Sequence, residues 1–185
     1  MTGKELLTPI TTLSSCTVYS NRWITVTEDT VKRHDGTSGI FGVVNMRDGA
    51  TVLAIDGNGS CYVVAEYKYA YGRVSIELIS GGIEEGESPL NAAKRELEEE
   101  VGVLADKWTD LGVLHPVTSL VASANHMFLA EGLHAGVQSL DPGEALSYHL
   151  VPFEQLRAEA IAGRVVHGAS CVAVLKAALL RGGPR

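Results

Sequence analysis

The chain has 185 residues, of which 45% are hydrophobic and 20% charged, and its formal net charge is −7. The length fits one ordinary domain, or one domain with a small addition. The net negative charge disfavours sequence-independent binding to nucleic acid, because it repels phosphates. The three scattered cysteines predict neither a disulfide framework nor a zinc site, and no run is apolar and long enough for a leader or a membrane span, so we expect a soluble, cytoplasmic protein without membrane attachment.

The N-terminal part of the chain has the character of β structure. Residues 1–14 are Thr/Ser-rich and are expected to be weakly structured. Residues 16–31 are rich in Thr, Val, Tyr, Ile and Trp, which predicts one or two strands with a break near Asn21. The turn signal His34-Asp35-Gly36 then favours a hairpin into residues 40–46.

The middle and C-terminal parts predict further strands and two closing helices. Short runs of alternating or continuous apolar residues predict strands at residues 51–55, 61–69, 74–79, 108–114, 126–133 and 147–151. Residues 153–162 and 170–180 have the character of helices, divided by Gly163 and Gly168. Because regular helices do not separate the strands, a doubly wound parallel sheet is disfavoured, and the pattern indicates a mixed α/β protein of the α+β type.

One segment between the strands changes to the period of a helix. Apolar residues recur there at steps of three and four, at Leu90, Ala93, Leu97, Val101 and Leu104. Ser88 followed by Pro89 predicts the helix start, and Gly102 predicts its exit.

Three glutamates on this helix suggest chemistry. Glu96, Glu99 and Glu100 are spaced i, i+3, i+4, so they project from one side, at the edge of the apolar stripe. Carboxylates crowded there repel one another unless cations bind them. Hard oxygen ligands without Cys or His suit Mg²⁺ or Mn²⁺, which can neutralise a diphosphate and activate water. For a glutamate run alone, a solvated, salt-bridged helix face is the competing interpretation.

The segment from Gly81 to Val103 resembles the Nudix box, which is a glycine, five residues, Glu, seven residues, then Arg-Glu-aliphatic-x-Glu-Glu-x-Gly-aliphatic. Every position of that pattern is present, at Gly81, Glu87, Arg95, Glu96, Leu97, Glu99, Glu100, Gly102 and Val103. The resemblance implies a Nudix fold, with a mixed β-sheet sandwiched between helices and an N-terminal antiparallel β-sheet extension. It places the extension, with roles in dimerisation and as a substrate lid, at residues 1–48, and the catalytic domain at residues 49–185.

The resemblance also assigns metal ligands residue by residue. Glu96 and Glu100 match the principal ligands, and Glu99 matches an additional ligand or a water-positioning group. Ser80, directly before the box, matches a position whose backbone carbonyl reaches a metal. The implied cofactor is Mg²⁺ or Mn²⁺.

The other catalytic assignments concern an arginine and a general base. Arg95 matches the arginine that orients the carboxylates and pairs with the position of Glu87. A glutamate on a late loop activates the water in similar proteins, and Glu144 is the best-placed match. A plain polar loop residue is an equally good interpretation of Glu144, and Asp141 is a weaker candidate.

Within the superfamily, the chain looks most like the ADP-ribose pyrophosphatase and nucleotide-sugar diphosphatase branch. Pro116 after the box and the run Glu66-Tyr67-Lys68-Tyr69 before it carry that likeness. Three substrate contacts are implied. Trp23 would stack on a base, with a core or dimer-interface role as the alternative. Lys68 would bind a phosphate unless it is simply exposed, and Glu77 would contact substrate or metal.

The implied reaction is metal-dependent hydrolysis of the diphosphate bond of a nucleoside diphosphate derivative, giving a nucleoside monophosphate and a sugar phosphate. The branch usually carries Leu-Pro-Ala/Gly-Gly where this chain has Leu78-Ile79-Ser80-Gly81, so nucleotide sugars other than ADP-ribose stay open. The alternatives are a Nudix-like module that senses a nucleotide sugar without cutting it, and a structural or partner-binding domain. The length and the N-terminal strands argue against a nucleoside triphosphate pyrophosphohydrolase. The N-terminal strands also resemble the segment that forms dimers in this branch, which implies a homodimer.

Overall fold

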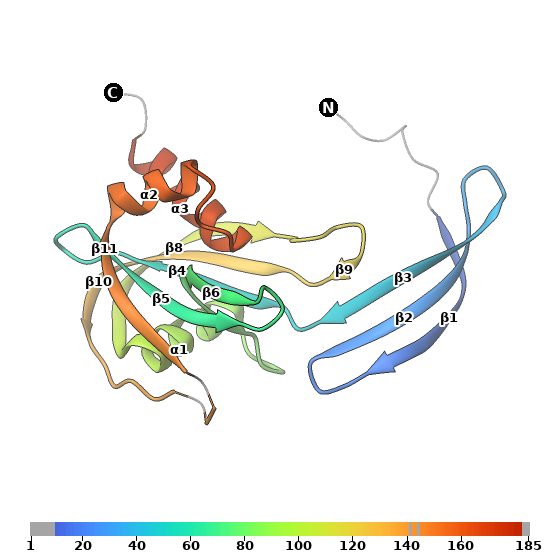
Figure 1. Cartoon of the computed structure of the whole chain (residues 1–185), viewed down its shortest axis with the longest axis horizontal. Coiled ribbons are helices and arrows are strands. Elements are labelled where there is room, and N and C mark those ends of the chain that lie inside the picture. Colours follow the sequence, from blue (N-terminus) through green and yellow to red (C-terminus); the bar gives the residue numbers. More distant parts are fainter. Residues whose placement is uncertain (1–9, 141, 144, 183–185) are drawn as a thin grey trace. The chain divides into compact units, whose positions relative to one another are not determined.

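The computed structural model of the chain describes residues 10–140, 142–143 and 145–182 (Figure 1). These residues form two compact units. The N-terminal unit comprises residues 10–47 together with Val117–Ser123, and the larger unit comprises Asp48–Pro116 and the described residues from Ala124 onward. Across the described ranges, no helix has the length and hydropathy needed to cross a membrane.

The N-terminal unit is a sheet in the order β1-β2-β3-β9. Its strands are β1 (Thr11–Ser20), β2 (Ile24–Lys32), β3 (Ser38–Met46) and the short β9 (Val121–Ala122). The first three strands pair antiparallel, which confirms the predicted N-terminal extension, and β9 adds a parallel partner to β3. β1 begins at Thr11, so the expectation of weak structure over residues 1–14 is wrong for 11–14, while residues 1–9 lie outside the described part.

The turns of this unit follow from short polar residues and glycine. The Asn21 Oδ1 atom accepts hydrogen bonds from the backbone N–H groups of Trp23, at 2.8 Å, and Ile24, at 2.9 Å, and so closes the turn between β1 and β2. Between β2 and β3, Gly36 has φ 82°, in the left-handed region that glycine tolerates best.

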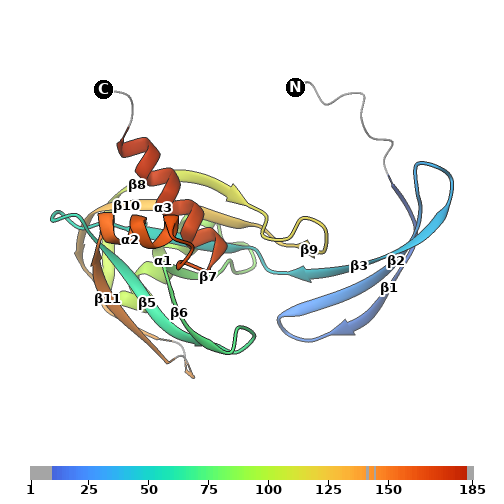
Figure 2. The same cartoon turned by 45° about the horizontal axis from the view of Figure 1, so that its top comes forward.

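The larger unit contains two sheets (Figure 2). The strand orders are β7-β4-β10-β8 and β11-β5-β6. The strands are β4 (Gly49–Ala54), β5 (Ser60–Lys68), β6 (Arg73–Glu77), β7 (Ile79–Gly82), β8 (Val103–Leu114), β10 (Asn125–Ala135) and β11 (Leu146–Pro152). The first sheet is mixed, because β10 runs parallel to β4 and antiparallel to β8. The helices are α1 (Pro89–Val101), α2 (Phe153–Ile161) and α3 (Gly168–Arg181).

Helices cover both faces of the mixed sheet, with α1 on one side and α2 and α3 on the other (Figure 1). Successive residues of a strand point to opposite faces. On β4, Val52 therefore packs in the cluster that includes Leu97 of α1, whereas Leu53 packs in the cluster that includes Val174 of α3. This arrangement confirms the predicted mixed sheet sandwiched between helices, and it fixes α1 firmly on the sheet.

The ends of α1 are set by the residues that predicted them. The Ser88 hydroxyl accepts a hydrogen bond from the backbone N–H of Asn91, and Pro89 occupies the first turn. Gly102, with φ 65°, ends the helix, and β8 starts at once at Val103. The assignment of Leu104 to the apolar stripe of the helix is therefore wrong, because Leu104 lies in β8.

The cap at Ser88 gives a stability prediction. Ser88 is exposed, so Ser88→Ala removes the cap without disturbing the core, and we expect the free energy of unfolding to fall by about 1 kcal/mol. Ser88→Asp keeps an acceptor and serves as the control, with a loss below about half of that value. Urea denaturation measures both variants, and an equal loss for the two would contradict the capping role.

The predicted strand over residues 74–79 is two strands. β6 ends at Glu77 and β7 starts at Ile79, and the two belong to different sheets. Leu78 is the single residue between them, and its side chain is buried in the core. The alternation of apolar residues over positions 74, 76 and 78 ends at the adjacent pair Leu78-Ile79, which marks the place where the chain passes from one sheet to the other.

Candidate active site on helix α1

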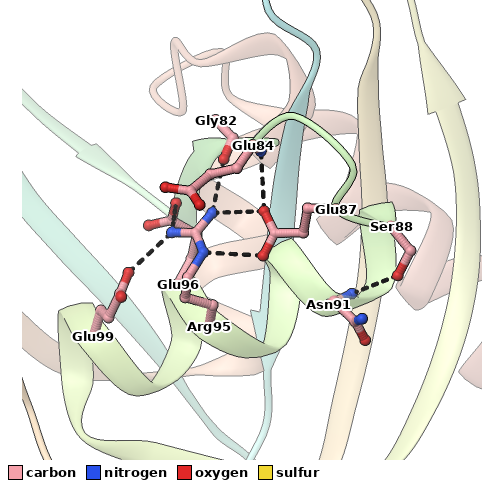
Figure 3. A network of polar contacts seen from close by, with 8 residues as sticks. All are labelled: Gly82, Glu84, Glu87, Ser88, Asn91, Arg95, Glu96 and Glu99. Carbon is pink, nitrogen blue, oxygen red and sulfur yellow. Dashed lines mark hydrogen bonds and ion pairs between the residues drawn. The ribbon is translucent and has the colours of Figure 1, made fainter.

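Arg95 on α1 is the centre of a polar network (Figure 3). Its Nε and Nη2 atoms donate to the two carboxylate oxygens of Glu87, each at 3.0 Å. Its Nη1 atom donates to Glu96 at 2.7 Å and to Glu99 at 2.9 Å. The Nη2 atom also donates to the carbonyl of Gly82 at 2.8 Å. One guanidinium therefore ties the loop before α1 to two of the three predicted metal-binding glutamates.

The charges of this network support one another. The hydrogen bond from Arg95 holds the pKa of Glu87 below its ordinary value, and the backbone N–H of Glu84 adds to that effect. The hydrogen bond to Glu87 likewise raises the pKa of Arg95, with Glu96 and Glu99 contributing further. A planar guanidinium bound at both oxygens of one carboxylate has a fixed direction. The interpretation of Arg95 and Glu87 as an orienting pair therefore has a geometric basis.

The carboxylate of Glu96 lies directly against the backbone of Gly81. A Cβ atom at position 81 would lie 1.9 Å from both Cδ and Oε1 of Glu96, well inside contact distance. Only glycine therefore leaves room for the Glu96 carboxylate where it stands. The conformational freedom of Gly81 is not the issue, because the requirement is one of space.

Glu96 and Glu100 are buried carboxylates, with relative exposures of 9% and 6%. Burying a carboxylate is costly unless hydrogen bonds or charges compensate it. Arg95 compensates Glu96. On the neighbouring sheet, Lys68 of β5 pairs with Glu66 and lies 3.8 Å from Glu77 of β6.

Lys68 is set among acidic groups, which determine its charge. Burial opposes the charged form, but the hydrogen bond to Glu66 and the charges of Glu77, Glu66 and Glu100 outweigh it, so the pKa of Lys68 is raised. The ammonium therefore stays protonated in any ordinary buffer. Glu100 of α1 is thus among the acidic groups whose charge acts on Lys68.

Comparison with known protein families identifies the family to which this chain belongs. The family model of the Nudix domain matches residues 45–168, more than half of the chain. The chain belongs to the Nudix family. A second model, described as the N-terminal domain of nucleoside diphosphate sugar hydrolases, matches residues 10–44.

Individual Nudix relatives carry related names. An ADP-ribose pyrophosphatase of Bacillus subtilis (strain 168) is 29% identical over 122 residues, which cover 66% of each chain. An ADP-ribose pyrophosphatase of Mycobacterium tuberculosis (strain ATCC 25618 / H37Rv) is 32% identical over 123 residues, which are 66% of this chain and 59% of that protein. The matched part thus spans slightly less than two thirds of these relatives. A solved structure titled as an ADP compounds hydrolase shares the fold, with a TM-score of 0.81, 23% identity and coverage of 97% of this chain and 98% of that one.

The residues of the Nudix box fit a hard divalent cation. Glu96, Glu99 and Glu100 offer carboxylate oxygens, and the segment before Gly81 offers backbone carbonyls, including that of Ser80. Within the described ranges, no three His, Cys, Asp or Glu side chains form a closed metal-binding group. An ion such as Mg²⁺ does not need one, because it usually keeps several waters and binds through one or two carboxylates plus substrate phosphates.

The remaining predicted residues fall in different places. Trp23 is in the N-terminal unit, 64% exposed, with the Arg22 guanidinium 4.2 Å from its ring centroid. Glu144 and Asp141 lie outside the described residues. Lys68 and Glu77 lie in the larger unit, 3.8 Å apart.

Two residues of the Nudix unit near Glu77 were missed from the sequence. His167 precedes α3, and its Nδ1 atom lies 3.6 Å from Glu77 Oε2 and 2.8 Å from Ser170 Oγ. Burial lowers the pKa of His167; the charge of Glu77 opposes that shift and the charge of Lys68 reinforces it. No motif singles out these residues, and only the fold brings them to Glu77.

The paired charges of Glu87 and Arg95 predict a pH-dependent contribution to stability. Because the folded pKa of Glu87 is lowered from its ordinary 4.5, the pairing stabilises the fold above that pH and is lost as the pH falls through the lowered value. We therefore expect Glu87→Gln to reduce the free energy of unfolding at neutral pH, and the difference from the wild type to vanish in acid.

Urea denaturation between neutral and acid pH measures this difference. Glu85→Gln, at an exposed position two residues earlier, is the control for loss of one negative charge. A difference for Glu87→Gln that does not change with pH, or that equals the effect at Glu85, would show that the ion pair contributes nothing.

Proposed function

We propose that this chain is a metal-dependent hydrolase of the diphosphate bond in nucleoside diphosphate derivatives, ADP-ribose or another nucleotide sugar. The products are a nucleoside monophosphate and a sugar phosphate. The observation that supports this proposal most directly is the orientation of Glu96 and Glu99 by Arg95 on α1, the helix at the centre of a complete box. The names of the relatives and the N-terminal family model support the substrate class.

In this proposal, Glu96, Glu99 and Glu100 hold Mg²⁺ or Mn²⁺, together with the backbone carbonyl of Ser80. When bound, such an ion neutralises diphosphate charge and lowers the pKa of a coordinated water. Arg95 keeps the carboxylates in place before any ion arrives, so little reorganisation is needed on binding.

Lys68 and Glu77 are proposed to meet the substrate. The Lys68 side chain is partly exposed, and the charge of Glu100 contributes to keeping it protonated. An ammonium is a compact charge that can donate to a phosphate oxygen. Glu77, whose side chain is only 11% exposed, holds that ammonium toward the site. Trp23 is proposed to stack on the base, and Glu144 is proposed as the general base that takes the proton of the attacking water.

We also propose that residues 1–48 serve dimerisation and cover the substrate in a homodimer, with residues 49–185 as the catalytic domain. Support comes from the surface of the N-terminal unit. All of β1 is exposed, and large apolar side chains stand open to solvent on its strands, among them Leu13, Val18, Tyr19, Ile40 and Phe41. Exposed apolar surface of this kind often marks an interface.

The experiment that tests the reaction is a cleavage panel. ADP-ribose, UDP-sugars, GDP-sugars, dinucleotides and nucleoside triphosphates are incubated with the protein and either Mg²⁺ or Mn²⁺, and the products are separated by ion exchange. We expect release of a nucleoside monophosphate from one class of nucleotide sugar. Tight binding of one member without cleavage would support a sensing module instead, and cleavage of triphosphates alone would place the chain in another branch.

A further inference from the structure

The backbone at Leu78 is held by side chains instead of by a sheet. Leu78 stands between Glu77, which pairs with Val64 in one sheet, and Ile79, which pairs with Val52 in the other. A residue at such a junction lies outside both ladders, and its buried N–H and C=O groups need other partners. Both groups find them in hydroxyl side chains.

The N–H group of Leu78 is bound from α3. It donates to the Ser170 hydroxyl at 2.9 Å, although the two residues are 92 positions apart in the sequence. Ser170 is fully buried, and its hydroxyl also lies 2.8 Å from His167 Nδ1. The start of α3 thus contacts the junction through one hydroxyl that the His167 ring orients.

The C=O group of Leu78 is bound by a hydroxyl of β7, which in turn contacts a hydroxyl of β4. It accepts from the Ser80 hydroxyl at 3.0 Å, and that hydroxyl lies 2.9 Å from the Thr51 hydroxyl. Because the Ser80 proton is used on Leu78, Thr51 donates to Ser80. Thr51 is fully buried, so this pair belongs to the interior of the protein.

The backbone at Leu78 connects two parts of the candidate site, one at Glu77 and the other at Gly81. On one side, Glu77 faces Lys68 at 3.8 Å and His167 at 3.6 Å. On the other side, Gly81 provides the surface against which the Glu96 carboxylate rests. A shift of the backbone at Leu78 would therefore move the Glu77 carboxylate and the support of Glu96 together.

We propose that Ser170 and Ser80 are positioning residues and that His167 orients Ser170. Together they hold the backbone from Glu77 to Gly81 in a fixed position relative to the carboxylates of α1. This inference rests on the proposed function, because it assigns α3 a part in metal binding and turnover. Supporting residues of this kind fix the orientation of metal ligands and catalytic groups, and their mutation lowers the metal affinity and the reaction rate.

The test compares Ser170→Ala with Val174→Ala. Val174 is buried one turn further along α3, in the same hydrophobic cluster as Leu78, so its truncation loosens the same helix and core but keeps the hydrogen bond from the Leu78 N–H to Ser170. For Ser170→Ala we expect Mn²⁺ affinity, measured without substrate by titration calorimetry, to fall by about tenfold, and kcat to fall by about tenfold to a hundredfold with little change in KM. For Val174→Ala we expect a lower Tm with both quantities near the wild type. If Ser170→Ala does not fold, His167→Phe, at a partly exposed position, takes its place with smaller losses in the same direction.

The outcomes separate this inference from the proposed function. Equal Mn²⁺ affinity and kcat in Ser170→Ala and Val174→Ala, with an active wild type, would overturn the positioning role and leave the hydrolase assignment intact. A wild type that neither binds Mn²⁺ nor cleaves any member of the panel would overturn both.

Discussion

Glu100→Gln is expected to lower kcat by at least about a hundredfold, because a bound divalent ion contributes several kcal/mol of charge stabilisation in the transition state. Glu100 is the most buried of the three predicted metal-binding glutamates, at 6% exposure, and its charge acts on the pKa of Lys68. Glutamine has almost the same shape as glutamate but is a weaker metal ligand. The fold should therefore survive while the metal site is weakened.

Steady-state kinetics with the best substrate of the panel measure this effect, and thermal unfolding checks the fold. Glu98→Gln is the matched control, since Glu98 is on the same helix and projects away from the carboxylate face toward Gly136. We expect Glu98→Gln to keep a rate within about threefold of the wild type, because its half-buried side chain lies away from the other three glutamates and substitutions away from such a site have small effects. If Glu100→Gln turned over substrate at the rate of the control, the assignment of Glu100 as a metal ligand would be wrong.

Gly81→Ala is expected to abolish most activity in a protein that still folds. The new Cβ would fall 1.9 Å from the Glu96 carboxylate. The clash is with the far end of a flexible side chain, so Glu96 moves away and the backbone need not. A displaced ligand costs about a hundredfold in rate when the misplacement is near 1 Å.

Gly82→Ala is a close control for this variant. Gly82 is the next residue of β7, and a Cβ added there meets nothing within 4 Å. Its carbonyl, which accepts from Arg95, is retained by alanine. We expect near-normal kcat for Gly82→Ala and a loss confined to Gly81→Ala, with far-UV circular dichroism unchanged in both. Similar activity in the two alanine variants would contradict the placement of Glu96 against Gly81.

Much of the fold could be predicted because local signals agreed with the tertiary structure. The start of α1 follows from Ser88 and Pro89, and its end follows from Gly102. Alternating strands and the absence of regular helices between them predicted a mixed α/β protein, and the resemblance to the Nudix box implied the mixed sheet between helices. Leu104 was misassigned because its spacing continued the helical period, whereas glycine ended the helix two residues before it.

The sequence predicted the carboxylates of the candidate site, but not the residues that support them. The pairing of Arg95 with Glu87 was expected from the box, and the structure adds the bonds from Arg95 to Glu96 and Glu99. Contacts such as Leu78 with Ser170 cross 92 residues and carry no local pattern, so only the folded chain reveals them. The break at Leu78 was overlooked because it occupies a single residue between β6 and β7, and the two sheets that separate there are formed with partners distant in the sequence.

The most direct test of the hydrolase proposal is release of AMP and ribose 5-phosphate from ADP-ribose, or the equivalent products from the best nucleotide sugar of the panel. The rate is measured in Mg²⁺, after addition of EDTA, and after Mg²⁺ is restored in excess. We expect cleavage that stops on chelation and returns with the metal. Cleavage that continues in EDTA, or no cleavage under any condition, would contradict a metal-dependent diphosphatase built on Glu96, Glu99 and Glu100.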